Sequence, residues 1–168
     1  MLSSRKASPY MSTIILESEV SLATLSSLLE DAAIDHSVED GGCIYVTASP
    51  FNFWISIDED RKFLRFYSYW PVAIDTPEDR LLRFVNECND SIILLQFSVT
   101  EDRQRFYGFY MMYYRDGVIR SQLLRIARLF SELFHRAVEH EDTEDLLSVE
   151  TLDPPLSKAE PSEGRAIH

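Results

Sequence analysis

The stretch "RFYGFYMMYYRDG", residues 105–117, contains the strand that decides how this chain folds. Eight of the nine residues from Phe106 to Tyr114 are large and apolar or aromatic. A strand that is buried on one side alternates apolar and polar residues, because successive side chains point to opposite faces of the sheet. This strand is apolar on both faces. The sequence therefore predicts that something covers the second face of its sheet.

Four more strands are predicted before this one, from short runs rich in aromatic and β-branched residues that turn signals separate. The five predicted strands cover residues 43–47, 51–58, 63–70, 91–100 and 105–114. Amphipathic stretches predict helices at residues 21–34, 77–90 and 118–140. The order helix-strand-strand-strand-helix-strand-strand-helix predicts an α+β fold, in which a five-stranded antiparallel sheet packs against helices.

Strand parity divides the predicted sheet into an aliphatic face, which helices should cover, and a mixed face. The mixed face carries Trp54, Tyr67, Tyr69, Leu94, Arg65 and Gln96. Alternation divides the side chains of residues 105–114 into two sets, and one set must lie on the mixed face. Both sets are apolar, so the sequence does not decide which one. Tyrosine, tryptophan and methionine are suited to protein interfaces. The candidate partner-binding residues are Trp54, Tyr67, Tyr69, Tyr107, Tyr110, Met111 and Met112. Three alternatives stay open for what covers the mixed face: a second protomer, a client segment or one of the protein's own helices.

The chain is acidic, with a formal net charge of −12 over 168 residues. An acidic body repels phosphates, so we expect no nucleic-acid partner. No run of 18 apolar residues is present, so we expect no membrane span. With only two cysteines, Cys43 and Cys88, the composition favours a reduced cytoplasm over a disulfide-stapled secreted domain.

Composition also predicts how the chain is divided. Residues 1–12 are expected to be a disordered N-terminus, residues 13–140 an α+β domain and residues 141–168 an acidic disordered tail, because the tail combines eight acids with "DPP" and "EPSEG". The sequence is compatible with a translation start at either Met1 or Met11, and the choice stays open.

The sequence shows no motif for catalysis, cofactor binding or metal binding. Its five glycines form no phosphate-binding loop before a helix. His135 and His140 are five residues apart on different faces of the last predicted helix, which disfavours a metal site. No serine lies in a G-x-S-x-G nucleophile elbow. We therefore expect a protein that is not an enzyme and that uses no cofactor or metal.

Two asparagines in "FVNECND", residues 84–90, need an explanation because asparagine is a poor helix former. Asn86 and Asn89 lie three residues apart, on one side of the second predicted helix. Either they end the helix, with Asn89 as its C-cap, or their side-chain amides bond the backbone of the neighbouring strand.

The stretch "LLRFVNECND", residues 81–90, followed by a strand and then by "RFYGFY", resembles the YbjN family of bacterial sensory transduction regulators. The hairpin "FNFWISIDEDRKFLRFYSYW", residues 51–70, is also similar to that family, and the resemblance covers roughly residues 20–140. It implies the fold of type III secretion chaperones, which are small acidic cytosolic dimers that bind extended segments of client proteins. It further implies that Asn86 and Asn89 are structural signature residues, and it supplies no catalytic residues. The acidic tail is not part of the family's usual pattern.

We therefore expect a non-enzymatic protein-binding module of the bacterial cytoplasm, chaperone-like or regulatory. It would form a homodimer and bind client segments on the aromatic sheet face. The alternative is a regulator that senses a small ligand in an aromatic pocket. A concave pocket with converging polar groups would favour the ligand, whereas a flat apolar patch would favour protein binding.

Overall fold

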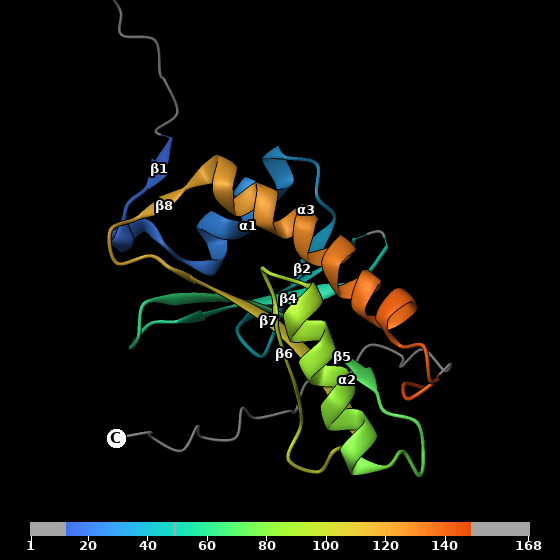
Figure 1. Ribbon diagram of the computed structural model, residues 1–168. Helices are drawn as coiled ribbons and strands as arrows, with labels where there is room; N and C mark the ends of the chain where they lie inside the picture. Colours follow the sequence, from blue (N-terminus) through green and yellow to red (C-terminus); the bar gives the residue numbers. More distant parts are fainter. Residues whose placement is uncertain (1–12, 49, 149–168) are drawn as a thin grey trace, which may run out of the picture.

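The computed structural model describes residues 13–48 and 50–148 of the chain. An antiparallel sheet runs in the order β2-β3-β4-β5-β7-β6, and β1 pairs with β8 in a separate two-stranded sheet (Figure 1). The strands are β1 (Ile14–Ile15), β2 (His36–Glu39), β3 (Cys43–Val46), β4 (Phe53–Asp58), β5 (Phe63–Pro71), β6 (Gln96–Val99), β7 (Arg105–Tyr113) and β8 (Val118–Ile119). The helices are α1 (Leu22–Asp31), α2 (Glu78–Ser91) and α3 (Arg120–Arg136), with short helical turns η1 (Glu17–Glu19) and η2 (Ala137–Glu141). The predicted α+β class is confirmed.

The prediction of five strands in the main sheet is wrong, because the sheet has six. The missed strand, β2, has only the four residues "HSVE", without Phe, Tyr or Trp and with a single β-branched residue. It pairs with β3 at one edge of the sheet. The strand predicted at 91–100 shortens to β6 because α2 continues to Ser91, and Ile93 is 93% exposed in the connection.

Local sequence explains where the first helix begins. Ser21 precedes α1 in an extended conformation, and its Oγ accepts a hydrogen bond from the backbone N–H of Thr24 at 3.1 Å. This bond satisfies one of the N–H groups that have no partner inside the helix. Ser21 is therefore the N-cap of α1.

All three described helices pack on one face of the main sheet, which we call the helix face (Figure 1). The ring of Phe84 on α2 lies 5.0 Å from the ring of Phe106 on β7. The ring of Phe130 on α3 lies 5.0 Å from the ring of Phe53 on β4. The strand register places Phe53 and Phe106 on the same side of the sheet, and the buried leucines of α1 join the same core. Burial of these large side chains is the main favourable term in folding.

Gly108 allows α3 to lie close to β7. A Cβ added at Gly108 would lie 2.6 Å from the ring of Phe134 and 3.0 Å from the ring of Phe97. Phe134 is fully buried, so its ring has little room to move away. A glycine in the middle of this strand is therefore required by the close approach of the helix.

The folded domain extends past the predicted start of the acidic tail at residue 141. The carboxylate of Asp142 accepts hydrogen bonds from the backbone N–H groups of Leu146 at 2.9 Å and Leu147 at 2.8 Å. Both leucines are 5% exposed, and Leu147 forms a β-bridge with Val72. The expected disorder at residues 1–12 and 149–168 lies outside the described residues.

Candidate functional site

The face of the main sheet opposite the helices carries a set of aromatic side chains, and we call it the open face. Register places Tyr45, Trp54, Tyr67 and Phe109 side by side across β3, β4, β5 and β7. The open face includes Glu39, Cys43, Tyr45, Trp54, Asp58, Phe63, Arg65, Tyr67, Tyr69, Arg105, Tyr107, Phe109, Met111 and Tyr113, with the small or polar Ser37, Ser56, Gln96 and Ser98 between them. Within the described ranges, no helix lies on this face (Figure 1).

The rings on the open face pack against one another. The ring centroids of Trp54 and Tyr67 are 5.9 Å apart, and those of Tyr69 and Tyr107 are stacked at 4.7 Å. These contacts leave Trp54 only 9% exposed, whereas Met111 at the margin is 40% exposed. Offset and edge-to-face ring pairs contribute about 0.5–1.5 kcal/mol each beyond the area they bury. The result is a preformed apolar surface with polar tips.

Two arginines place cationic groups on the open face, and register places the acidic Glu39 and Asp58 at other positions of the same face. The guanidinium carbon of Arg105 lies 5.9 Å from the ring centroid of Tyr69, within cation–π distance. Neither Arg65 nor Arg105 forms an ion pair with another residue of the described chain, and the Nε of Arg65 is buried without a hydrogen-bond partner there. Burial raises the pKa of the Tyr107 hydroxyl, and the nearby charge of Arg65 opposes that rise. An acidic group on a partner would complement both cations.

Cys43 and Tyr67 form a neutral polar pair on the same face. Burial and the charge of Glu39 raise the pKa of the Cys43 thiol, while a hydrogen bond with the Tyr67 side chain lowers it. Burial also raises the pKa of Tyr67 well above its usual range. The Cys43 thiol is therefore protonated near pH 7 and a weak nucleophile there, because the thiolate is the reactive form.

The structure separates the seven residues predicted to bind a partner. Trp54, Tyr67, Tyr69, Tyr107 and Met111 lie together on the open face. Tyr110 and Met112 alternate with them along β7 and lie on the helix face, where Met112 is 8% exposed and the ring of Tyr110 is 6.1 Å from that of Phe66. Gly108 belongs to this second set, and its missing side chain was the available signal for the set that packs beneath a helix.

Several members of the open face were not among the sequence candidates. Tyr45, Phe109 and Tyr113 share the face with Trp54 and Tyr107 through register and alternation alone. Arg65 and Arg105 share it for the same reason. The alternation of side chains along each strand could have placed them, once Trp54 and Tyr107 were known to lie on one side.

Asn89 fastens the edge strand β6 to α2. Its Oδ1 accepts a hydrogen bond from the backbone N–H of Phe97 at 2.8 Å, and its Nδ2 donates one to the Phe97 carbonyl at 3.0 Å. The hypothesis that an asparagine amide bonds the neighbouring strand is confirmed for Asn89, and the C-cap of α2 is Ile92 instead. Asn86 is exposed, and its side chain makes no hydrogen bond to another described residue.

A broad hollow opens at the tips of the β4–β5 hairpin and the β7–β8 connection. It is lined by Asp60, Arg61, Phe63, Tyr113, Arg115 and Asp116. Its charges are mixed in sign and its aromatic floor is wide open to solvent, because Tyr113 is 67% exposed. It lacks the enclosure that small-molecule sites usually have.

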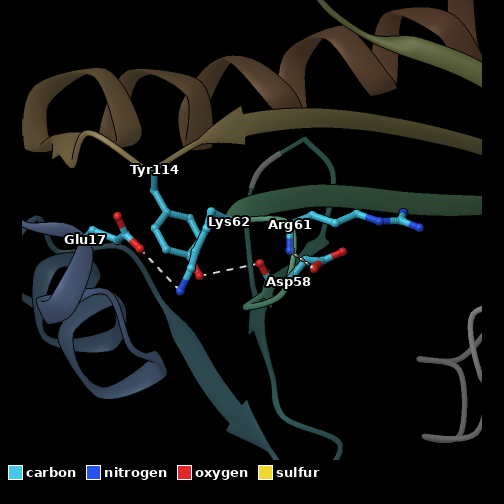
Figure 2. A network of polar contacts seen from close by, with 5 residues as sticks. All are labelled: Glu17, Asp58, Arg61, Lys62 and Tyr114. Atoms are coloured by element: carbon cyan, nitrogen blue, oxygen red, sulfur yellow. Dashed lines mark hydrogen bonds and ion pairs between the residues drawn. The ribbon is translucent and has the colours of Figure 1, made fainter.

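Figure 2 shows the polar network that holds this hairpin in place. The Tyr114 hydroxyl donates to the Asp58 carbonyl at 3.5 Å, and the Arg61 N–H donates to Asp58 Oδ1 at 2.9 Å. The Nζ of Lys62 lies 3.4 Å from Glu17 Oε1 and 5.8 Å from the centroid of the Tyr114 ring. The network joins the hairpin to η1 and to the end of β7, so its role is structural.

The described ranges contain no group of three or more His, Cys, Asp or Glu side chains placed to hold a metal ion. The rings of His135 and His140 are 6.3 Å apart, near the end of α3. None of the helices that the structure describes is long and apolar enough to cross a membrane. The open face is therefore the site with the strongest physical evidence.

Comparison with known proteins gives one family and several related folds. The profile of YbjN, described as "Putative bacterial sensory transduction regulator", matches residues 21–142. None of the curated proteins compared with this chain matches it in sequence.

Three solved structures are similar. The first is the crystal structure of YbjN, "a putative transcription regulator from E. coli", with 15% identity, a TM-score of 0.64 and coverage of 77% of this chain and 96% of that chain. The second is a chain of the ExsC–ExsE complex, with 14% identity, a TM-score of 0.50 and coverage of 78% and 100%. The third is the Yersinia pestis type III secretion chaperone SycH, solved with a fragment of YscM2, with 14% identity, a TM-score of 0.46 and coverage of 68% and 93%. At these identities the likeness shows the fold alone.

Proposed function

This chain belongs to the YbjN family, and on that premise we propose that it is a non-enzymatic protein-binding module, chaperone-like or regulatory, which binds a client segment on the open face. The observation that carries the proposal is a sheet face of ring side chains that no described helix covers. A chain of the ExsC–ExsE complex has the same fold, which supports protein binding as a use of this architecture.

The composition of the open face supports a protein rather than a small ligand as its partner. Tyr69 and Tyr107 combine an apolar ring with a hydroxyl, so they tolerate both water and a partner. Met111 adds a flexible apolar side chain that adapts to different shapes. Arg65 and Arg105 would pair with acidic groups of the client. The surface spans several strands, whereas a small-molecule site is concave and enclosed.

The alternative function, sensing of a small ligand, has the hollow at the hairpin tips as its structural candidate.

We further propose that the protein acts in the bacterial cytoplasm as a homodimer. Size-exclusion chromatography with light scattering tests the dimer, and a mass equal to one chain at micromolar concentration would contradict it.

A pair of matched variants tests the binding face. Met111→Asp places a charge on the open face, and Leu82→Asp places one at a similarly exposed position on α2, since the two side chains are 40% and 46% exposed. In pull-downs from bacterial lysate, Met111→Asp should reduce the recovery of specific partners at least fivefold and Leu82→Asp should not. The double variant Trp54→Ala with Tyr67→Ala should act in the same direction. Equal recovery with Met111→Asp and Leu82→Asp would place the binding surface elsewhere.

A further inference from the structure

The described chain ends at the margin of the open face. The backbone N–H of Ser148 donates to the carbonyl of Pro71 at 2.9 Å, and its carbonyl accepts from Trp70 Nε1 at 2.8 Å. Pro71 is the last residue of β5 and pairs in register with Arg105 on β7. Arg105 in turn lies over Tyr69. The described chain therefore ends beside the last residues of β5, across that strand from Arg105.

The packing around Ser148 restricts where the following residues can go. Further along β5, the carbonyl of Asn52 accepts a hydrogen bond from Ser68 Oγ at 3.0 Å, so that side of the strand is occupied. On the helix face, the ring of Phe51 lies 5.1 Å from Trp70 and 4.7 Å from Phe134. Those three rings fill the space above the end of β5. Among the described residues, nothing comparable closes the direction toward the open face.

We propose that residues 149–168 of the same chain dock on the open face and cover it when no client is bound. The segment begins "VETLDPPLSKAE", which combines apolar residues, two adjacent prolines and acids. Segments rich in proline bind aromatic-lined grooves at low entropic cost, because their extended conformation is already formed. Glu150 and Asp153 would supply carboxylates to Arg65 and Arg105, which form no ion pair with another described residue.

The dimensions of the open face fit this segment. Cys43 lies two strands from β5 and in the same row as Arg65, which is six residues from Pro71. At about 4.8 Å per strand and about 3.3 Å per residue, Cys43 is about 22 Å from Pro71. Leu156 is eight residues beyond Ser148, and eight extended residues span about 26 Å. Leu156 can therefore reach Cys43 along the face.

The regulatory meaning of the docked segment rests on the proposed function of the open face. A client would bind only the fraction of molecules in which the segment has left the open face. The apparent dissociation constant for the client is therefore the intrinsic constant divided by that fraction. The docking of the segment does not itself depend on any client. The two proposals can therefore fail separately.

Disulfide trapping in the full chain tests the docking. The native Cys43 is a reporter on the open face, whereas Cys88 is fully buried on α2. With Leu156→Cys, mild oxidation should link position 156 to Cys43 within one chain, as peptide mapping would show. The matched reporter is Ser27→Cys in a Cys43→Ser background, because Ser27 is exposed on α1, on the opposite side of the same sheet. When each rate is divided by that thiol's own rate with a small disulfide reagent, which corrects for differences in burial and pKa, the link to Cys43 should form at least tenfold faster than the link to position 27.

Two results would overturn the proposal. Equal rates for the two reporters would mean that the segment does not prefer the open face. A disulfide formed mainly between two chains would mean that a second copy, rather than the segment of the same chain, covers the face. Adding Glu150→Lys and Asp153→Lys should slow the link to Cys43 at least threefold, and an unchanged rate would contradict the pairing with Arg65 and Arg105. Client recovery that is unaffected by Met111→Asp would instead overturn the proposed function and leave the docking intact.

Discussion

The side chain of Asn89 bonds both backbone groups of Phe97, accepting from its N–H at 2.8 Å and donating to its carbonyl at 3.0 Å. At this position of β6, the Asn89 side chain therefore makes the two backbone hydrogen bonds that a neighbouring strand would otherwise make. β6 is the last strand of the sheet order, and an edge strand with free N–H and C=O groups is a template for pairing with another chain. Asn89 thus occupies one point of an edge that would otherwise be open.

Replacing Asn89 should destabilise the protein through these two bonds. Asn89→Ala removes both, and we expect a loss of about 1–3 kcal/mol in the free energy of unfolding, since each such bond contributes about 0.5–1.5 kcal/mol. Asn89→Asp keeps the acceptor for the Phe97 N–H but turns a second oxygen toward the Phe97 carbonyl, so it should also destabilise. Urea unfolding followed by circular dichroism measures both.

The neighbouring asparagine is the control for this prediction. Asn86 is exposed and makes no side-chain hydrogen bond to another described residue, so Asn86→Ala should change the free energy of unfolding by less than about 0.5 kcal/mol. If Asn86→Ala costs as much as Asn89→Ala, the bonds to Phe97 do not explain the importance of the pair.

Gly108 should not tolerate even one added carbon. Gly108→Ala would place a Cβ 2.6 Å from the buried ring of Phe134, and overpacking of this kind costs about 1–3 kcal/mol. The double variant Gly108→Ala with Phe134→Leu should recover part of the stability, because a smaller side chain relieves the clash. Thermal or urea unfolding gives the values. Additive effects of the two substitutions would show that the ring of Phe134 is not the cause.

Stability should fall in alkaline solution. Burial raises the pKa of the Cys88 thiol to about 12, whereas an unfolded cysteine ionises at about 8.5. The unfolded state therefore loses its proton first, so this contribution is fully present below pH of about 8.5 and is lost as pH rises toward about 12. The raised pKa of Tyr67 and Tyr107 adds a similar loss above pH of about 10.

Urea unfolding at pH 7, 8.5, 10 and 11 tests this order. Cys88→Ala should reduce the decline between pH 8.5 and 10, to which the Cys43 thiol also contributes, and should leave the later decline in place. A wild-type stability that stays constant up to pH 11 would contradict the burial of these groups.

Much of this architecture follows from strand alternation and helix periodicity. The central hairpin, the three helices and the aliphatic face were predicted because apolar residues such as Ile55 and Phe66 repeat with the period of a strand. The strand β2 was missed because "HSVE" carries no such pattern. Leu146 and Leu147 were assigned to the tail because acids surround them, although an adjacent apolar pair was a signal for packing.

The open face was harder to predict, because which side of β7 it takes depends on register with distant strands. Both sets of side chains on β7 are apolar, so polarity could not separate Tyr107 and Met111 from Tyr110 and Met112. The bonds between Asn89 and Phe97 depend on how α2 packs against the edge of the sheet, and the sequence of the helix alone does not predict that packing. Strand parity had already placed Arg65 on the mixed face with Tyr67, whereas Arg105 is assigned to that face through its register with Pro71.

The central claim is that a protein partner covers the open face, and oxidative footprinting of methionine tests it most directly. Met111 is 40% exposed on the open face, and the adjacent Met112 is 8% exposed on the helix face. The full chain with Glu150→Lys and Asp153→Lys, which weaken the docking of its own C-terminal segment, would be oxidised alone and when saturated with a partner recovered in the pull-down. Both samples would be oxidised for the same time and analysed by mass spectrometry. We predict that the partner slows oxidation of Met111 at least fivefold while Met112 stays slow in both. Unchanged oxidation of Met111 in the saturated complex would contradict the account.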